Sequence, residues 1–441
     1  KALLTAVHSV ETIHNAERMG INTTLQSIDF GRLRDFRVST VETMTKGLTG
    51  LLAHRGVTVF RGCAALQNAH TVRVTPAEGE TQVSRSVEAG VFEPVETELA
   101  IDADDVVLAT GSRPLALPGN PFAGALIDST QALELNTLPS SAVIIGAGAV
   151  ALEFASLWNA AGCEVTLLIR KDRVLSTWER RASMTLTREL KRRGVNVIAR
   201  TAVDRVDTGA NLGATVHYRQ GDSDEDRTAY GEVVLAAIGR VPNTDADWFR
   251  SSGLKLDERG YVTVDGYGRT NLDGVWALGD ITPGHALAHR AFEQGITIAE
   301  KIAGADPKPV IDDTVPQVVF SFPEAASVGL TLDQAKARED VVEPKETAYP
   351  MLSNARMLMS GEGGSMTVVS GAFANNPDMQ VVLGVHIVSP IASDLIAEAE
   401  QLVGNRVPLA DAARLIHPHP TFSETLGEAL LKADGRPLHT R

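Results

Sequence analysis

The chain has 441 residues, of which 44% are hydrophobic and 22% are charged. This composition is typical of an ordinary globular protein, and the length allows about three domains. The 55 acidic residues outnumber the 41 basic ones and give a net charge of −14, which argues against a surface for nucleic acid or anionic membrane. The most apolar stretch, residues 143–162, contains Glu153 and Asn159, so we expect no membrane span.

The chain contains two cysteines, Cys63 and Cys163. Their separation matches neither a metal site nor a redox pair, and it excludes a disulfide scaffold. We therefore expect both to be small, packed hydrophobic residues in a reducing compartment. From these two cysteines we predict that the protein is cytoplasmic and has no metal site.

The chain begins inside a predicted helix. Leu3, Val7, Val10 and Ile13 recur on one helical face, and Gly20 stands where a helix is expected to end. No initiator methionine and no targeting signature come before this helix. We therefore expect that a preceding segment has been removed.

Two pairs of segments share a pattern and occur in the same order. Residues 51–60 and 189–198 each end a helix at a glycine and enter a short strand, and residues 104–114 resemble residues 231–242. Strands that alternate with helices in this way are typical of parallel, doubly wound sheets. The repeat predicts two related α/β domains.

The second copy opens with a complete strand–turn–helix–strand unit at residues 141–175. Residues 143–145 form the predicted strand, Gly146 permits a tight turn, and Gly148 lets the backbone approach a pyrophosphate. Ala151 is the small third residue of this glycine-rich fingerprint. The same turn could be purely structural, but the strand before it and the helix and strand after it favour dinucleotide binding.

The first copy has no such opening. Its strand–glycine–helix unit would lie before Lys1, so we expect a missing nucleotide-binding element of at least about 30 residues.

Several motifs carry a family resemblance that runs through the whole chain. They are "VVLATGSRP" (106–114), the fingerprint at 146–151, "GRVPNTD" (239–245) and "GVWALGD" (274–280). In this order they resemble the FAD-dependent pyridine nucleotide–disulfide oxidoreductases. The segment "HPHPTFSETLGEAL" (417–430) is similar to the dihydrolipoyl dehydrogenase branch of that family.

The resemblance implies a homodimer and a particular order of domains along the chain. Two doubly wound dinucleotide-binding domains, the first truncated, would precede a C-terminal α+β dimerisation domain. The expected ranges are an FAD-binding domain at 1–120, an NAD(P)-binding domain at 121–243, a central segment completing the FAD site at 244–313, and the dimerisation domain at 314–441. The missing segment would contain the FAD-phosphate glycines and a CxxxxC redox pair.

The resemblance also implies cofactor-binding residues. Lys1 would lie near the flavin and pair with Glu153, a carboxylate in an apolar run that needs a partner. Asp280 would bind the ribityl chain of FAD, although a loop cap is the alternative. The other residues implied to bind cofactor are Ala109, Thr110, Gly111, Gly239, Arg240, Gly279, Ala288 and His289.

The same resemblance assigns His419 and Glu424 to acid–base catalysis. A histidine oriented by a carboxylate is a suitable base near neutral pH, and the pair would serve a thiol across the dimer interface. His417 is interpreted as structural. A structural role for the whole stretch remains the alternative.

The sequence departs from NAD-using relatives after the second strand of the fingerprint unit. Such proteins place Asp or Glu there to bind the ribose 2′-hydroxyl, whereas this chain has Ile169 followed by Arg170 and Lys171. The change favours NADP, but a second phosphate-binding arginine of NADP-using relatives corresponds to Ser176. NAD with a surface charge cluster is therefore the open alternative.

These residues predict a flavoprotein disulfide oxidoreductase that uses FAD and NADP or NAD. Its partner would be a small dithiol or disulfide of lipoyl type, free or on a lipoyl domain. Without the redox cysteines, the chain alone is expected to be inactive on dithiols and to hold FAD weakly. A flavin-dependent quinone reductase and an inert dimer module are the alternatives.

Overall fold

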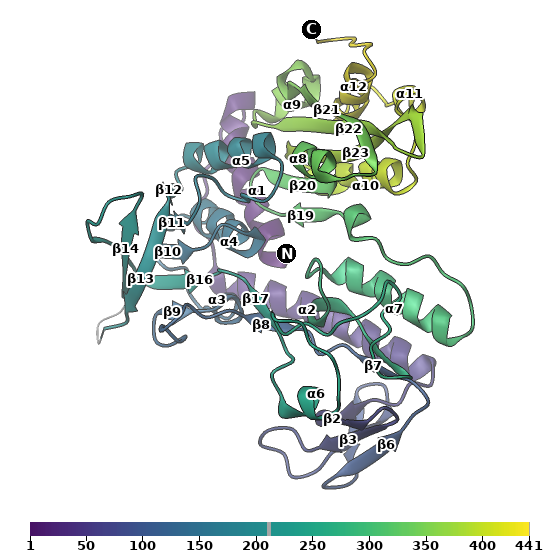
Figure 1. Cartoon of the computed structure of the whole chain (residues 1–441). Coiled ribbons are helices and arrows are strands. Elements are labelled where there is room, and N and C mark those ends of the chain that lie inside the picture. The colour runs from purple at the N-terminus through teal and green to yellow at the C-terminus, as the bar shows by residue number, and fades with distance from the viewer. Residues whose placement is uncertain (210–212, 441) are drawn as a thin grey trace. The chain divides into compact units, whose positions relative to one another are not determined.

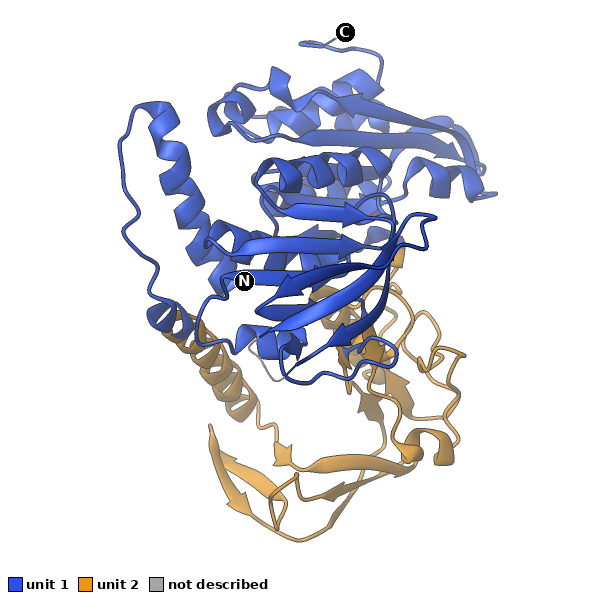
Figure 2. Ribbon diagram, turned by 90° about the vertical axis from the view of Figure 1, so that its left-hand side faces the viewer, with its two compact units in different colours: residues 1–34, 114–239, 313–441 blue, residues 35–113, 240–312 orange. Residues whose placement is uncertain are grey.

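The computed structural model describes residues 1–209 and 213–440. The chain divides into two compact units, shown in blue and orange in Figure 2. Unit 1 comprises residues 1–34, 114–239 and 313–441, and unit 2 comprises residues 35–113 and 240–312. Within the described residues, no helix has both the length and the apolar composition needed to cross a membrane.

The centre of unit 1 is a five-stranded parallel sheet with the order β12-β11-β10-β16-β9 (Figure 1). Its strands are β9 (Leu126–Ile127), β10 (Ser141–Ile145), β11 (Glu164–Ile169), β12 (Asn196–Ala199) and β16 (Val233–Ala236). The chain builds outward from β10 to β11 and β12, and then continues on the other side with β16. In open α/β sheets, ligands bind at the carboxyl ends of the strands where the order reverses in this way.

Alternate residues of β10 contribute to two different cores. Ala142 and Ile144 belong to a cluster with buried residues of three helices, whereas Val143 and Ile145 belong to a cluster with Val216 of an antiparallel sheet. The helices are α1 (Ala2–Ala16), α4 (Ala149–Ala160) and α5 (Arg180–Arg192); the sheet contains β13 (Thr201–Asp207), β14 (Ala214–Gln220) and β15 (Arg227–Gly231). The antiparallel layer follows from the alternating burial along β14, because side chains alternate between the faces of a strand.

The first helix forms as the sequence predicts. Leu3, Val7 and Val10 of α1 are buried, while Ile13 is partly exposed. After α1 a short 3-10 turn (Glu17–Met19) ends at Gly20, whose φ of 81° is the left-handed conformation that glycine adopts readily.

The C-terminal part of unit 1 is an antiparallel sheet with the order β19-β20-β23-β22-β21. Helices α10 and α12 share a hydrophobic core with β20, β22 and β23, which confirms the predicted α+β character of this part. The strands are β19 (Gln317–Val319), β20 (Glu324–Gly329), β21 (Val341–Tyr349), β22 (Ser365–Phe373) and β23 (Asn376–Ser389). The helices are α8 (Leu332–Ala337), α9 (Ala355–Ser360), α10 (Ala392–Gly404), α11 (Leu409–Ala412) and α12 (Glu424–Ala433), and α3 (Ser129–Leu133) lies earlier in the unit.

Unit 2 contains a parallel pair, β7 (Val106–Leu108) with β18 (Val275–Ala277). Val106, Leu108 and Val275 form its core with Phe249 of α6. Unit 2 also contains two antiparallel sheets of three strands each. The first consists of β2 (Cys63–Asn68), β3 (Thr71–Thr75) and β6 (Leu99–Asp102). The second consists of β1 (Phe60–Arg61), β4 (Ser84–Glu88) and β5 (Val91–Pro94). The remaining elements are α6 (Asp247–Ser251), α7 (Ala288–Ile302), β8 (Ser112–Pro114), β17 (Arg240–Pro242) and α2 (Phe30–His54), which begins in unit 1.

The two cysteines differ in environment. Cys163 is buried, and burial raises the pKa of its thiol to about 12. Cys63 is exposed, so the expectation that both are packed was wrong. Cys63 begins β2, an edge strand of its sheet in which only Leu66 is buried, and an apolar residue type on such a strand does not guarantee burial.

Candidate functional site

The predicted site residues fall into one set in each unit. Unit 1 contains Lys1, Gly146, Gly148, Ala151, Glu153, Arg170, Lys171, Gly239, His419 and Glu424. Unit 2 contains Ala109, Thr110, Gly111, Arg240, Gly279, Asp280, Ala288 and His289.

The turn after β10 requires glycine at position 146. Gly146 has a φ of 140°, and a Cβ at this position would lie 2.2 Å from the carbonyl oxygen of Ala237. The same Cβ would lie 3.5 Å from the Cβ of Ala151, which is fully buried. The close approach of α4 to the sheet therefore depends on Gly146 and on the small side chain at Ala151, as the fingerprint predicts.

Gly148 lies in a different environment. It is the N-cap of α4 with a φ of −90°, and a Cβ there would have no heavy atom within 4 Å. The space beside the first amides of α4 is thus open, which suits a pyrophosphate. Gly239 follows β16, the strand next to β10, so the same end of the sheet contains all three glycines.

Arg170 and Lys171 follow β11 at this end of the sheet. Both are exposed, and neither forms an ion pair among the residues that the structure describes. The neighbouring Asp172 is already paired with Arg173, at 3.0 Å from Nη1. Arg173 also donates to the carbonyl oxygen of Ser176 at 3.1 Å, which leaves two unpaired cations beyond β11.

Lys1 and Glu153 form the ion pair that the resemblance implies. The backbone N–H of Phe320 donates to Glu153 Oε1 at 3.1 Å, and Lys1 Nζ lies 3.9 Å from the centroid of the Phe320 ring. Glu153 is 18% exposed and Lys1 55%. The carboxylate of α4 therefore has two donors, which offset the cost of its partial burial.

In unit 2, Asp280 is connected to Arg240 through Ser112. Ser112 Oγ donates to Asp280 Oδ2 at 2.5 Å. Arg240 Nε donates to Ser112 Oγ and Nη2 to the Ser112 carbonyl oxygen, both at 2.7 Å. Ser112 lies within the motif at 106–114, but nothing in the sequence connects it with Asp280, which is 168 positions away. The serine holds the carboxylate and the guanidinium in one cluster.

The remaining predicted residues of unit 2 are close in sequence to Ser112 or to Asp280. Thr110 Oγ1 donates to the carbonyl oxygen of Asn243, whose side chain donates back to the Thr110 carbonyl oxygen, each at 2.9 Å. Gly111 has a φ of 70° and open space where a Cβ would lie. Gly279 donates its N–H to Gln294 of α7 at 2.8 Å. Ala109, Ala288 and His289 are exposed, the last two in the first turn of α7.

His419 and Glu424 form the predicted pair. His419 Nδ1 lies 2.8 Å from Glu424 Oε1, and the N–H of Thr421 donates to Oε2 at 2.8 Å. Burial opposes the shift, but the Thr421 N–H and the imidazole of His419 together lower the pKa of Glu424. Because the pKa of Glu424 is lower in the folded protein than in the unfolded chain, its ionised carboxylate stabilises the fold at a pH above the unfolded-state pKa. This contribution is lost as the pH falls through the folded-state pKa. The imidazole is 77% exposed and can reach a ligand.

Two further histidine–glutamate pairs lie beside this one. His417 Nε2 is 2.9 Å from Glu398 Oε1 of α10, and His439 Nδ1 is 2.8 Å from Glu428 Oε1 of α12. The hydrogen bond to Glu398 raises the pKa of His417, whose side chain is only 9% exposed. The low exposure of the His417 side chain is consistent with the structural interpretation of this residue.

Gly427 on α12 makes room for His417. A Cβ at Gly427 would lie 2.4 Å from His417 Nδ1, and the hydrogen bond to Glu398 restricts movement of the ring. We expect Gly427→Ala to destabilise the protein by about 1–2 kcal/mol, because overpacking exceeds the gain in helix propensity. Urea unfolding measures the change. Gly47→Ala in α2 is the control, because nothing lies within 4 Å of a Cβ at that position. There the same exchange should raise the free energy of unfolding. An equal rise in both variants would contradict the prediction.

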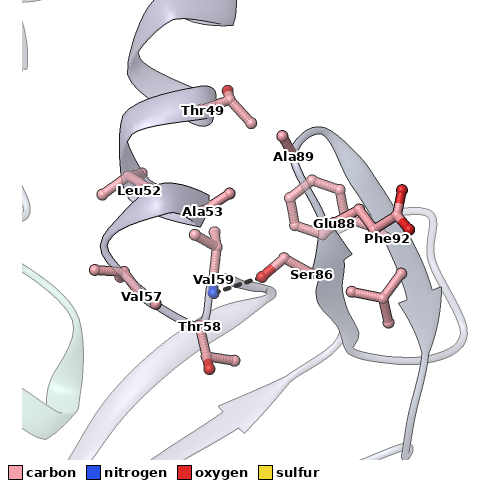
Figure 3. Close-up of a pocket in the computed structure, with 12 residues that line it drawn as sticks. Thr49, Leu52, Ala53, Val57, Thr58, Val59, Ser86, Glu88, Ala89 and Phe92 are labelled. Atoms are coloured by element: carbon pink, nitrogen blue, oxygen red, sulfur yellow. Dashed lines mark hydrogen bonds between the residues drawn. The ribbon is translucent and has the colours of Figure 1, made fainter.

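A pocket of about 200 Å³ lies elsewhere in unit 2 (Figure 3). The end of α2, including Leu52, lines one side, and the β4–β5 hairpin, including Phe92, lines the other. The N–H of Val59 donates to Ser86 Oγ at 2.9 Å within it. None of the predicted site residues lines this pocket, so it is separate from the Ser112 cluster.

Comparison with known proteins agrees with the motifs. Residues 1–295 match the family model described as pyridine nucleotide-disulphide oxidoreductase, and residues 315–430 match the dimerisation domain of the same family. Among solved structures, LpdA from Mycobacterium tuberculosis superimposes with a TM-score of 0.81 at 26% identity, over 98% of this chain and 89% of that one. The flavoprotein disulfide reductase RclA from Escherichia coli has the same fold, with a TM-score of 0.78 at 22% identity, over 97% of this chain and 88% of that one.

Curated relatives cover the whole chain. The dihydrolipoyl dehydrogenase of Geobacillus stearothermophilus is 35% identical over 445 residues, which include 100% of this chain and 87% of that protein. The dihydrolipoyl dehydrogenase of Bacillus subtilis is 32% identical over 445 residues, with 100% and 88% covered. This chain therefore belongs to the pyridine nucleotide–disulfide oxidoreductases, a family of enzymes that use FAD and NAD(H).

Proposed function

We propose that this protein is a homodimeric flavoprotein disulfide oxidoreductase of dihydrolipoyl dehydrogenase type. Its substrate would be a small dithiol or disulfide of lipoyl type, free or on a lipoyl domain. The observation that supports this function most directly is the exposed His419–Glu424 pair, because exchange of thiols and disulfides needs a group that moves a proton. The full-length similarity to dihydrolipoyl dehydrogenases supports it independently.

The proposed division of roles follows the ranges expected from the sequence. Residues 1–120 and 244–313 would bind FAD, residues 121–243 would bind NAD(P), and residues 314–441 would form the dimer. A bound flavin supplies two-electron transfer between nicotinamide and disulfide. Asp280, held by Ser112, would accept a hydrogen bond from a cofactor hydroxyl.

His419 and Glu424 would manage the proton of the substrate thiol. Glu424 accepts from Nδ1, which leaves Nε2 as the atom that takes the thiol proton and returns it in the reverse direction. The carboxylate also stabilises the imidazolium formed in between. In the proposed dimer, this pair serves the redox thiols of the partner subunit.

Cys63 and Cys163 are not proposed as these thiols. Cys163 is buried with a pKa of about 12, so almost none of it is thiolate at neutral pH, and the thiolate is the reactive form. The two residues also belong to different units. A polypeptide of these 441 residues is therefore proposed to bind nucleotide without turning over dithiols.

NADPH is the proposed nicotinamide cofactor. No carboxylate occupies the first two positions after β11, where Arg170 and Lys171 are unpaired, and the carboxylate of Asp172 is paired with Arg173. One charge-assisted contact contributes about 1.5–3 kcal/mol, or a preference of about tenfold or more. We expect NADPH to bind more tightly than NADH in fluorescence titrations, by a margin that shrinks with added salt.

Arg170→Ala should remove most of this preference. Arg188→Ala on α5 is the matched control, because it removes the same charge from an exposed position of unit 1 and should leave the preference intact. Equal affinities for the two nucleotides in the unchanged protein would identify NAD as the cofactor. Failure to bind either nucleotide would refute the proposed function.

A further inference from the structure

The end of β12 lies directly beside the end of β11. The two strands are parallel, and Ile169 of β11 pairs with Ala199 of β12 as the last register pair. Arg170 and Arg200 are therefore the first residues beyond two adjacent strand ends. The N–H of Arg200 donates to the carbonyl oxygen of Lys171 at 3.0 Å, which ties the two segments together.

The backbone at Arg200 is unusual. Its φ of 57° lies in the left-handed region, which residues other than glycine, asparagine and aspartate rarely adopt. Its carbonyl oxygen accepts from the N–H of Gly221 at 2.8 Å. Strained residues of this kind cluster at ligand sites. The Arg200 side chain is exposed, and its guanidinium carbon lies beside Gly221, 3.8 Å from where a Cβ of that glycine would stand.

The charge of Arg200 is not neutralised within the described chain. The adjacent turn, residues 221–226, contains four acidic residues, yet Arg200 forms no ion pair with any of them among the described contacts. Two of these acids face other arginines: Asp224 lies 3.9 Å from Arg219, and Glu225 lies 2.9 Å from Arg227. Arg200 therefore joins Arg170 and Lys171 as a third unpaired cation at the carboxyl end of the sheet.

We infer that Arg200 is a second specificity-determining arginine, which binds the 2′-phosphate of NADP together with Arg170 and Lys171. The inference rests on the proposed NADPH preference and deepens it. Ser176, where NADP-using relatives were expected to place their second arginine, offers only a hydroxyl, and its carbonyl oxygen is occupied by Arg173. A guanidinium from β12 would approach the phosphate from the neighbouring strand and supply a planar fork of donors.

The test compares 2′,5′-ADP with 5′-ADP, which differ only by the 2′-phosphate, in calorimetric titrations of the 441-residue chain. Arg200→Asn removes the charge but retains a residue that tolerates positive φ. We expect it to weaken 2′,5′-ADP binding about tenfold, with 5′-ADP binding unchanged. Arg200→Lys should retain part of the affinity, and Arg188→Ala should behave like the unchanged protein.

Each other result overturns the inference in a distinguishable way. If Arg170→Ala loses the 2′-phosphate preference and Arg200→Asn does not, Arg200 has no role while NADP use stands. If Arg200→Asn weakens both ligands equally, its effect is structural. If the unchanged protein binds both ligands equally, the phosphate site is refuted but nucleotide binding remains; if it binds neither, the proposed function fails as well.

Discussion

Gly146→Ala is expected to abolish binding of nicotinamide dinucleotides. The added Cβ would stand 2.2 Å from the Ala237 carbonyl oxygen, and this backbone atom cannot yield as a flexible side chain could. The φ of 140° adds strain for any residue with a Cβ. Together these effects should lower the free energy of unfolding by about 3 kcal/mol or more and displace the first turn of α4. Nucleotide titration and urea unfolding measure the two losses.

Gly148→Ala provides the contrast. The position has open space around its Cβ and a φ of −90°, so the variant should fold with a stability within about 0.5 kcal/mol of the unchanged protein. Its methyl group would nevertheless occupy the space beside the α4 amides and should weaken nucleotide binding about tenfold or more. Unaltered affinity in Gly146→Ala would contradict the role of the turn, and unaltered affinity in Gly148→Ala would mean that the pyrophosphate lies elsewhere.

His419→Gln is expected to lower turnover of a lipoyl-type dithiol by about 10²–10⁴-fold, the usual contribution of a general base. The measurement is steady-state dithiol oxidation by a flavin-loaded dimer in which this sequence is joined to the expected CxxxxC segment. Nucleotide affinity should not change, since no residue of the fingerprint is altered. Glu424→Gln should cause a smaller loss, because the imidazole remains and only its orientation and charge stabilisation are weakened.

His439→Gln is the matched control for this prediction. His439 forms the same type of pair, with Glu428 at 2.8 Å, and is 65% exposed. It should retain the turnover of the unchanged protein. Equal losses in both variants would indicate that breaking any histidine–glutamate pair disturbs the C-terminal sheet, and would remove the assignment of His419 as the base.

The fingerprint unit could be predicted from the sequence because its determinants are local. The predicted strand at 143–145 lies within β10, and the predicted helix and second strand of the unit at 141–175 are α4 and β11, since glycine turns and apolar runs act over a few residues. The Lys1–Glu153 pair could be expected only through the family resemblance, because the two residues are far apart in sequence. The resemblance thus supplied long-range information that periodicity lacks.

Other features could not be predicted because they depend on tertiary context. The hydrogen bond from Ser112 to Asp280 spans 168 positions, and neither residue signals the other. The exposure of Cys63 was missed because its strand is an edge strand whose covered face the sequence does not reveal. The positive φ of Arg200 lies at the junction of β12 and β13, and no glycine or asparagine at this position signals it in the sequence.

The central claim is that the nucleotide site lies at the carboxyl end of the parallel sheet in unit 1. Amide hydrogen exchange of the chain, with and without saturating NADPH, tests this claim most directly. We predict protection in the segment 146–152, which includes the first turn of α4, and in the segment 170–172 after β11, with no comparable change in the pocket between α2 and the β4–β5 hairpin. Protection confined to unit 2, or no protection at 146–152 under saturating nucleotide, would contradict the account.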